Sequence, residues 1–281
     1  MTDCVVSTDW LAQRLDAPDI VVLDASWHLP PSRRDARAEY LAEHIPRALF
    51  FDIDEIADTA NPLPHMLPAP EKFASLMRRM GIGDGKQVIV YDSIGLYSAA
   101  RAWWMLRVFG HDDVAVLDGG LPKWKAEGRP LADGPPGPIQ ERHFTARLNS
   151  LMVRDKDEVR RALQSGQAEI ADARSPGRFA GTEPEPRAGL RSGHMPGARN
   201  LHYARLLNPD GTLKDEAAIM AALGEAGIDL SRPVVTSCGS GVTAAILNLG
   251  LERVGHKDHG LYDGSWSEWG ADPALPVTTE A

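Results

Sequence analysis

The chain carries one pattern twice, and this internal repeat constrains the fold more than any other feature. Four short stretches of the first half recur in the same order in the second half. They pair residues 19–25 with 169–173, 44–48 with 194–198, 87–92 with 233–238, and 117–120 with 262–265. A tryptophan follows the last stretch in each copy, at Trp124 and Trp269. Self-similarity at a nearly constant offset indicates a duplicated structural unit.

Each copy alternates short apolar stretches with amphipathic ones. Residues 234–236 predict a buried strand, and residues 98–109 predict a helix that ends at Gly110. Alternation of this kind favours a mostly parallel sheet with helices on both faces. We therefore predict an α/β fold built by tandem duplication, with domains at 1–140 and 151–281. The run of glycine and proline at 133–138 can hold neither a helix nor a central strand, and we expect a linker at 141–150.

The bulk composition argues against several classes of protein. The chain has 281 residues, of which 43% are hydrophobic, and no apolar run is long enough to cross a bilayer. Its first residues lack the basic segment and apolar core of a signal peptide, so we expect a cytoplasmic protein. The net charge of -9 argues against nucleic acid and anionic membranes as partners but leaves small anionic substrates open. Only Cys4 and Cys238 are cysteines, which argues against a disulfide framework or a zinc site.

Cys238 is the strongest candidate for a reactive side chain. It lies between the predicted strand at 234–236 and a predicted helix at 242–253. Backbone N–H groups and the helix dipole at such a junction stabilise a thiolate, and the glycines on either side of Ser240 let the backbone curl around one atom. The pattern predicts a nucleophilic sulfur. Cys4 has no such context and is expected to be a small buried side chain.

The two copies differ at this position. Aligning Gly95 with Gly241 places Asp92 where the second copy has Cys238, so the first copy lacks the nucleophile. Because ligand sites favour domain interfaces, we expect the first copy to supply a wall of the active site. Several residues recur in both copies and are expected to be structural, at strand ends and turns: Asp24, Asp118, Asp172 and Asp263. The tryptophans are expected to fill the core or the interface: Trp103, Trp104, Trp124, Trp266 and Trp269.

The duplicated layout, the missing first cysteine and the loop at 238–244 resemble the two-domain rhodanese-like sulfurtransferases. The resemblance covers nearly the whole chain and includes 24–27, 50–54, 65–68 and the unusual Gly-Thr-Glu-Pro-Glu-Pro-Arg run at 181–187. Gly239 and Ser240 stand where thiosulfate-specific members carry a bulky basic pair, so the loop is similar to the mercaptopyruvate type. The resemblance implies a persulfide intermediate, a small anionic sulfur donor, an acceptor such as thioredoxin, a small thiol or cyanide, and no bound cofactor or metal. We expect a monomer, because the interface between the domains already buries one face of each.

The resemblance also implies roles for individual residues. The family motif places its substrate-binding arginines at Arg178 and Arg187, and guanidinium groups match the carboxylate and carbonyl of a 2-oxo acid. Judged by the residues alone, these arginines would form surface ion pairs with Glu183 or Glu185. The loop residues expected to surround the transferred sulfur are Gly239, Gly241, Val242 and Thr243.

A proton relay of Ser240, His65 and Asp54 is a further implication of the resemblance. A serine beside a thiolate passes a proton only when a base stands behind it, and a carboxylate can orient that base. Judged by the residues alone, His65 is a loop histidine and Asp54 is a solvated acid or a helix cap. Without the family pattern these two side chains would not be connected to Cys238.

Four other functions share part of this sequence pattern. A thiosulfate:cyanide sulfurtransferase is the nearest, and only the small loop argues against it. A cysteine phosphatase needs an arginine where this chain has Ala244. A dinucleotide-binding site matches the glycine pattern at 239–244 but lies too near the C-terminus for the rest of that fold. A rhodanese-like binding or sulfur-carrier module remains open.

Overall fold

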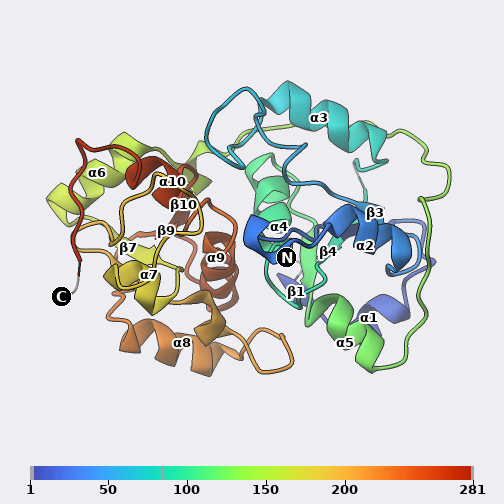
Figure 1. Cartoon of the computed structure of the whole chain (residues 1–281). Helices are drawn as coiled ribbons and strands as arrows, with labels where there is room; N and C mark the ends of the chain where they lie inside the picture. Colours follow the sequence, from blue (N-terminus) through green and yellow to red (C-terminus); the bar gives the residue numbers. More distant parts are fainter. Residues whose placement is uncertain (1–2, 84, 280–281) are drawn as a thin grey trace. The chain divides into compact units, whose positions relative to one another are not determined.

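The computed structural model describes residues 3–83 and 85–279. Contacts divide the chain into two compact units, which are described separately (Figure 1). The first unit holds most residues up to Asn149 together with Pro209–Leu213. The second holds Ala60–Met66, Ser150–Asn208 and the chain from Lys214 onwards.

The first unit is built on a parallel five-stranded sheet of order β1-β5-β4-β2-β3. Its strands are rich in valine, leucine and isoleucine, as expected for strands that are covered on both faces. Their bounds are β1 Val5–Val6, β2 Ile20–Asp24, β3 Leu49–Phe50, β4 Gln87–Tyr91 and β5 Val114–Leu117. The helices are α1 Thr8–Ala12, α2 Ala36–Ala42, α3 Pro70–Arg79, α4 Ala99–Val108 and α5 Gly120–Ala126, with a 3-10 turn η1 at Pro30–Ser32.

Helices cover both faces of this sheet. Residues of α1, α2 and α5 share one core cluster with Val22, Ile89 and Leu117 of the strands. Strand residues next to these, such as Val90, point to the opposite face because side chains alternate along a strand. Helix α4 packs against β4 and β5 and is buried along almost its whole length. The first core therefore has two layers, one on each side of the sheet.

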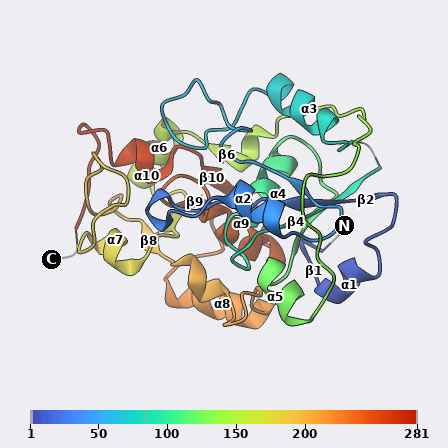
Figure 2. The ribbon, with the colours of Figure 1, turned by 45° about the vertical axis from the view of Figure 1, so that its right-hand side comes forward.

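The second unit repeats this architecture. Its parallel sheet has the order β6-β10-β9-β7-β8, which is the order of the first sheet with equivalent strands substituted. The strands are β6 Val153–Arg154, β7 Glu169–Asp172, β8 Arg199–Asn200, β9 Val234–Ser237 and β10 His259–Tyr262. The helices are α6 Lys156–Ser165, α7 Pro176–Ala180, α8 Glu216–Glu225, α9 Ala244–Arg253 and α10 Ser265–Trp269, with 3-10 turns η2 Ser150–Met152 and η3 Tyr203–Leu206. Helices α6 and α10 share one side of the sheet and α9 packs on the strands from the other (Figures 1 and 2).

The predicted α/β duplication is confirmed down to single hydrogen bonds. Trp124 and Trp269 donate their indole N–H groups to equivalent proline carbonyls, at 2.8 and 2.9 Å. All five tryptophans expected in the core or the interface are fully buried. The predicted helix at 98–109 is α4, and that at 242–253 is α9, which starts two residues later at Ala244.

The segment that follows Ala132 contains no helix or strand up to the turn at Ser150–Met152. It is held against the first unit, where Arg147 N–H donates to the Phe109 carbonyl at 2.9 Å and Phe144 is buried. None of the helices formed by residues 3–83 and 85–279 is long and apolar enough to cross a membrane.

Candidate active site

Cys238 lies at the carboxyl end of the second sheet, in the loop that joins β9 to α9. Its side chain is a free thiol and the residue is 2% exposed. The start of α10 fixes the loop: Cys238 N–H donates to Ser265 Oγ at 3.2 Å, and its carbonyl accepts from Trp266 N–H at 3.0 Å. The loop turns at Gly241, whose φ of 77° lies in the left-handed region that favours glycine. The sulfur is therefore held at a turn between a strand and a helix, as predicted.

The first copy reveals what such a loop can hold. Asp92 occupies the position of Cys238, since its carbonyl accepts from Leu121 N–H at 3.0 Å just as that of Cys238 accepts from Trp266. Its buried carboxylate accepts five backbone N–H groups at 2.7–3.0 Å, from Ile94, Gly95, Tyr97, Ser98 and Ala99. Successive backbone N–H groups that converge in this way form an anion-binding concavity. The second copy places a cysteine, whose reactive form is an anion, at the equivalent junction between strand and helix.

The two predicted arginines come together at this loop. A Cβ atom added to Gly239 would lie 2.9 Å from Arg178 Nη2 and 3.9 Å from Arg187 Nη1. Two guanidinium groups therefore approach the residue that follows the nucleophile. The approach of Arg178 explains why position 239 has no side chain.

Arg178 also forms the ion pair that was the alternative to substrate binding. Its Nη2 lies 2.5 Å from Glu185 Oε2, and its Nε donates to Oε1 at 3.3 Å. The Glu185 side chain is only 2% exposed, so this is a buried contact and not a solvated surface pair. The pair orients Arg178 and leaves its side chain 20% exposed.

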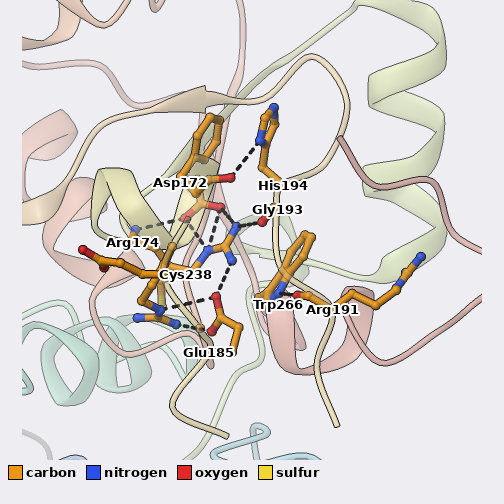
Figure 3. A network of polar contacts seen from close by, with 12 residues as sticks. Asp172, Arg174, Glu185, Arg191, Gly193, His194, Cys238 and Trp266 are labelled. Carbon is orange, nitrogen blue, oxygen red and sulfur yellow. Dashed lines mark hydrogen bonds and ion pairs between the residues drawn. The ribbon is translucent and has the colours of Figure 1, made fainter. Parts of the chain in front are cut away.

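Arg174 is a central residue of the site that the sequence analysis did not select (Figure 3). Its guanidinium contacts Asp172 Oδ2 at 2.7 Å, Glu185 Oε1 at 2.7 Å and the Gly193 carbonyl at 2.9 Å, and its Cζ lies 4.1 Å from the centre of the Trp266 ring. Burial acts to lower the pKa of Arg174, but Asp172 and Glu185 more than offset it and raise that pKa. Arg174 thus connects Glu185, which holds Arg178, to Trp266, whose backbone N–H donates to the Cys238 carbonyl. The sequence gives one sign of this residue: the two copies differ at the aligned position, which is Ser26 in the first copy and Arg174 in the second.

His65 belongs to the second unit and contacts Arg187. Its Nε2 lies 3.2 Å from Arg187 Nη2. Since a guanidinium only donates hydrogen bonds, Nε2 is the acceptor and Nδ1 carries the proton. The residue is 5% exposed and has a φ of 62°, a conformation that costs a side-chain-bearing residue energy and is common at functional sites.

The other predicted residues lie as follows. Ser240 is 4% exposed and Val242 is 2% exposed, and with Thr243 they complete the loop that leads into α9. Asp54 belongs to the first unit, where its carboxylate accepts from Trp27 Nε1 at 3.0 Å. The structure brings Cys238, Arg178, Arg187 and His65 into one site within the second unit, and describes Asp54 with the other unit.

Several polar side chains hold backbone groups of their own unit. Asp24 and Asp172 each accept the backbone N–H two residues later, and Asp118 accepts from Leu213 N–H at 2.7 Å. Arg191, which is close in sequence to Arg187, donates to four backbone carbonyls of 269–275. Within the described ranges, no group of three or more His, Cys, Asp or Glu side chains could hold a metal ion.

Comparisons with known proteins agree with this architecture. A family model for the rhodanese-like domain matches residues 7–127 and 155–272. The human 3-mercaptopyruvate sulfurtransferase is 44% identical over 271 residues, which cover 94% of this chain and 91% of that protein. The Arabidopsis thaliana protein named thiosulfate/3-mercaptopyruvate sulfurtransferase 1, mitochondrial, is 42% identical over 293 residues, or 97% of this chain and 77% of that protein. The crystal structure of SseA from Escherichia coli matches with a TM-score of 0.87 at 41% identity, covering 94% of this chain and 99% of that chain.

Proposed function

Since this chain belongs to the family of rhodanese-like domain proteins, we propose that it moves the sulfur of 3-mercaptopyruvate through a Cys238 persulfide to a thiol or to cyanide, releasing pyruvate. The names of full-length relatives from human and Arabidopsis thaliana support sulfur transfer as the activity. The donor, the intermediate and the acceptor are the parts of the proposal that need an experiment.

One observation carries the proposal. Cys238 lies at the strand–helix junction at which the first copy binds a carboxylate through five backbone N–H groups. Beside it, Arg178 and Arg187 approach Gly239. A site with an anion-binding loop and two guanidinium groups suits a donor that has an anionic sulfur at one end and a carboxylate at the other.

In the first half-reaction the Cys238 thiolate attacks the thiol sulfur of 3-mercaptopyruvate. A sulfur–sulfur bond forms as the carbon–sulfur bond breaks, and the electron pair of the broken bond moves onto the carbon and the 2-oxo oxygen as an enolate. Arg178 and Arg187 bind the carboxylate and stabilise the developing charge. The products are pyruvate and a persulfide anion on Cys238, whose outer sulfur the loop N–H groups stabilise.

The proton of the donor thiol must reach the enolate carbon. We assign its transfer to Ser240, with His65 as the base behind it and Asp54 as the residue that orients the base. His65 Nε2 becomes available as the base when Arg187 turns its N–H groups from the histidine to the substrate carboxylate. The contact between His65 Nε2 and Arg187 Nη2 supports a place for this histidine beside the substrate carboxylate.

In the second half-reaction an acceptor thiolate attacks the outer sulfur of the persulfide. The sulfur–sulfur bond breaks and its electron pair returns to Cys238 as the thiolate, so the enzyme is regenerated and no external oxidant is needed. Cyanide reacts at the same sulfur to give thiocyanate. Thioredoxin and small thiols are both candidates for the acceptor.

The decisive experiment compares kcat/KM for 3-mercaptopyruvate and thiosulfate with one thiol acceptor and Cys238→Ser as the blank. The proposal requires a preference for mercaptopyruvate that disappears in the blank. Turnover that survives in Cys238→Ser would remove the nucleophile. A persulfide that mass spectrometry detects after incubation with the donor, without any turnover, would identify a sulfur carrier and not an enzyme.

Thiosulfate is the second candidate donor, and one relative carries both donors in its name. It is a dianion without a carboxylate, so it would use the loop and the arginines but not the enolate chemistry. Gly239 and Ser240 present no cation to it. A preference for thiosulfate would retain Cys238 as the nucleophile and overturn the roles given to Ser240 and His65.

A further inference from the structure

A cavity of about 440 Å³ opens in the first unit, and none of its lining residues is assigned to sulfur transfer. Asp24 and Ser26 line it where β2 ends, and Ser93 lines it where β4 ends. Leu121, near the start of α5, closes another part of the wall. The cavity therefore lies at the carboxyl end of a parallel sheet, where α/β folds commonly bind ligands.

The second copy fills the equivalent place with the side chain of Arg174. Asp24 and Asp172 end equivalent strands, and each carboxylate accepts the backbone N–H two residues later. The donor is Ser26 at 2.9 Å in the first copy and Arg174 at 3.0 Å in the second. Ser26 thus stands in the position of Arg174. The first copy keeps the carboxylate and lacks the guanidinium that the second copy places against it.

Other groups around Arg174 also have counterparts in the cavity wall. Trp266, which packs on the guanidinium, is equivalent to Leu121. The backbone N–H of each donates to the carbonyl of the residue that follows the aligned strand, β9 or β4. Gly193, whose carbonyl accepts from Arg174, is equivalent to Glu43. The next residue in each copy is a histidine, His194 or His44, that forms an antiparallel bridge near the end of its unit. Both Leu121 and Glu43 line the cavity. The cavity has the position that a guanidinium occupies in the other copy.

The polar groups of the cavity leave room for a cation. Asp24 is 1% exposed, and its hydrogen-bond partners are the neutral residues Ser26 and Tyr91. Burial raises the pKa of the Asp24 carboxyl, and a cation against it would favour the charged form. The hydroxyl oxygen of Ser93 is buried and has no hydrogen-bond partner among residues 3–83 and 85–279.

The remaining charges of the wall do not neutralise Asp24. Glu39 and Glu43 line the cavity, but each already has a cation of its own. Arg34 lies 2.7 Å from Glu39, and Lys125 lies 2.5 Å from Glu43. The wall thus holds three carboxyl groups and two cations, and the carboxyl group without an ion pair is the most deeply buried one.

We propose that this cavity binds a small organic cation of the guanidinium class, with its planar group against Asp24 as Arg174 lies against Asp172. A guanidinium presents forked N–H donors that match a carboxylate with two bonds, whereas an ammonium ion presents a point charge. The second copy supplies the template for the forked contact, with Nε and Nη2 of Arg174 on the two oxygens of Asp172. Leu121 stands in place of Trp266, and its smaller side chain leaves space for a substituent on the ligand.

The test measures binding of methylguanidinium to the full-length protein by saturation-transfer NMR on the methyl signal. Methylurea, which has the same shape without the charge, is the control ligand, and potassium chloride controls for ionic strength. We expect saturable binding of methylguanidinium alone, weakened at least tenfold in Asp24→Asn. Equal binding of methylurea, or binding that Asp24→Asn leaves unchanged, would overturn the proposal.

A second pair of variants tests the cavity without removing Asp24. Ser26→Arg places a guanidinium in the cavity through the chain itself, so it should abolish methylguanidinium binding and raise the Tm. Ser26→Ala removes the same hydroxyl, which accepts from Ser93 N–H at 2.9 Å, but leaves the cavity empty and should retain binding. If Ser26→Arg folds and still binds the probe as the wild type does, the ligand site lies elsewhere.

Discussion

Glu185 and Arg178 make a two-point contact, in which Oε2 lies 2.5 Å from Nη2 and Oε1 lies 3.3 Å from Nε. The same Oε1 accepts from Arg174 at 2.7 Å. One buried carboxylate therefore restrains an arginine proposed to bind the substrate and ties it to the residue that packs on Trp266. A mobile guanidinium would lose more freedom when it bound a carboxylate, so this contact prepares Arg178 for the substrate.

Glu185→Gln is expected to raise KM for 3-mercaptopyruvate about tenfold, a loss of roughly 1.4 kcal/mol of binding, with a smaller change in kcat. The physical reason is that a neutral amide holds Arg178 less firmly. Steady-state kinetics at saturating acceptor measure the effect. Glu183→Gln is the matched control, because Glu183 lies in the same run, is exposed and accepts from the Ser175 hydroxyl at 3.0 Å instead of holding an arginine. A Glu185→Gln enzyme with the KM of the wild type would show that the pair is merely structural.

Gly239→Ala is expected to lower kcat/KM for the donor by roughly 10²-fold, because the new methyl group would displace Arg178 Nη2, which lies 2.9 Å from its position. Urea unfolding should show that the variant remains folded. Gly224→Ala in α8 is the control, since a Cβ there meets nothing within 4 Å. Loss of activity in both variants would point to a general effect on the unit and not to the arginine.

Asp92→Ala should lower the free energy of unfolding by about 3 kcal/mol, because five buried backbone N–H groups would lose their acceptor. Asp92→Asn should lower it less, since an amide oxygen still accepts. Chemical denaturation followed by circular dichroism measures both. Asp112→Ala is the reference, and its side chain is 83% exposed, so a change within about 0.5 kcal/mol is expected. Equal effects of Asp92→Ala and Asp112→Ala would refute the role of the carboxylate in the loop.

We expect the free energy of unfolding to fall at mildly acidic pH because of the buried His111. Burial lowers the pKa of His111 below its usual 6.5, and its Nε2 has no hydrogen-bond partner among the described residues. The folded state therefore binds fewer protons here than the unfolded state. The stability that this group contributes is present above pH 6.5 and is lost as the pH falls through the folded pKa.

The test compares the wild type with His111→Phe in urea unfolding between about pH 7.5 and about pH 5.5. The wild type should lose up to about 1.4 kcal/mol per pH unit more than the variant, the limit for one proton. His143→Phe, at an exposed position, should follow the wild type. Parallel pH curves for wild type and His111→Phe would contradict the prediction.

The sequence predicted the features that repeat along it. Apolar strands such as Gln87–Tyr91 and the glycines around Ser240 are local signals, and their recurrence in both copies revealed the duplicated parallel sheet. These fold predictions needed only neighbours in sequence or a matching second copy. The roles expected of Arg178 and Arg187 came from the family resemblance, because the residues alone favoured surface ion pairs.

The features that the sequence did not predict depend on contacts that residue types and their spacing do not specify. Arg174 is buried because Glu185 and the Gly193 carbonyl reach it from other parts of the chain. The role of Asp92 depends on backbone N–H groups, which no residue type specifies. The position of His65 beside Arg187 joins residues 122 apart in sequence. The difference between Ser26 and Arg174 was visible in the alignment of the copies, but its meaning needed the cavity.

Asp92 also explains how one half of a duplicated enzyme can lose its chemistry and keep its fold. In the first copy the carboxylate of Asp92 accepts the N–H groups of its own loop. A loop that closes on an anion from within the chain needs no ligand to stay folded, and the sheet behind it keeps the strand order of the other copy.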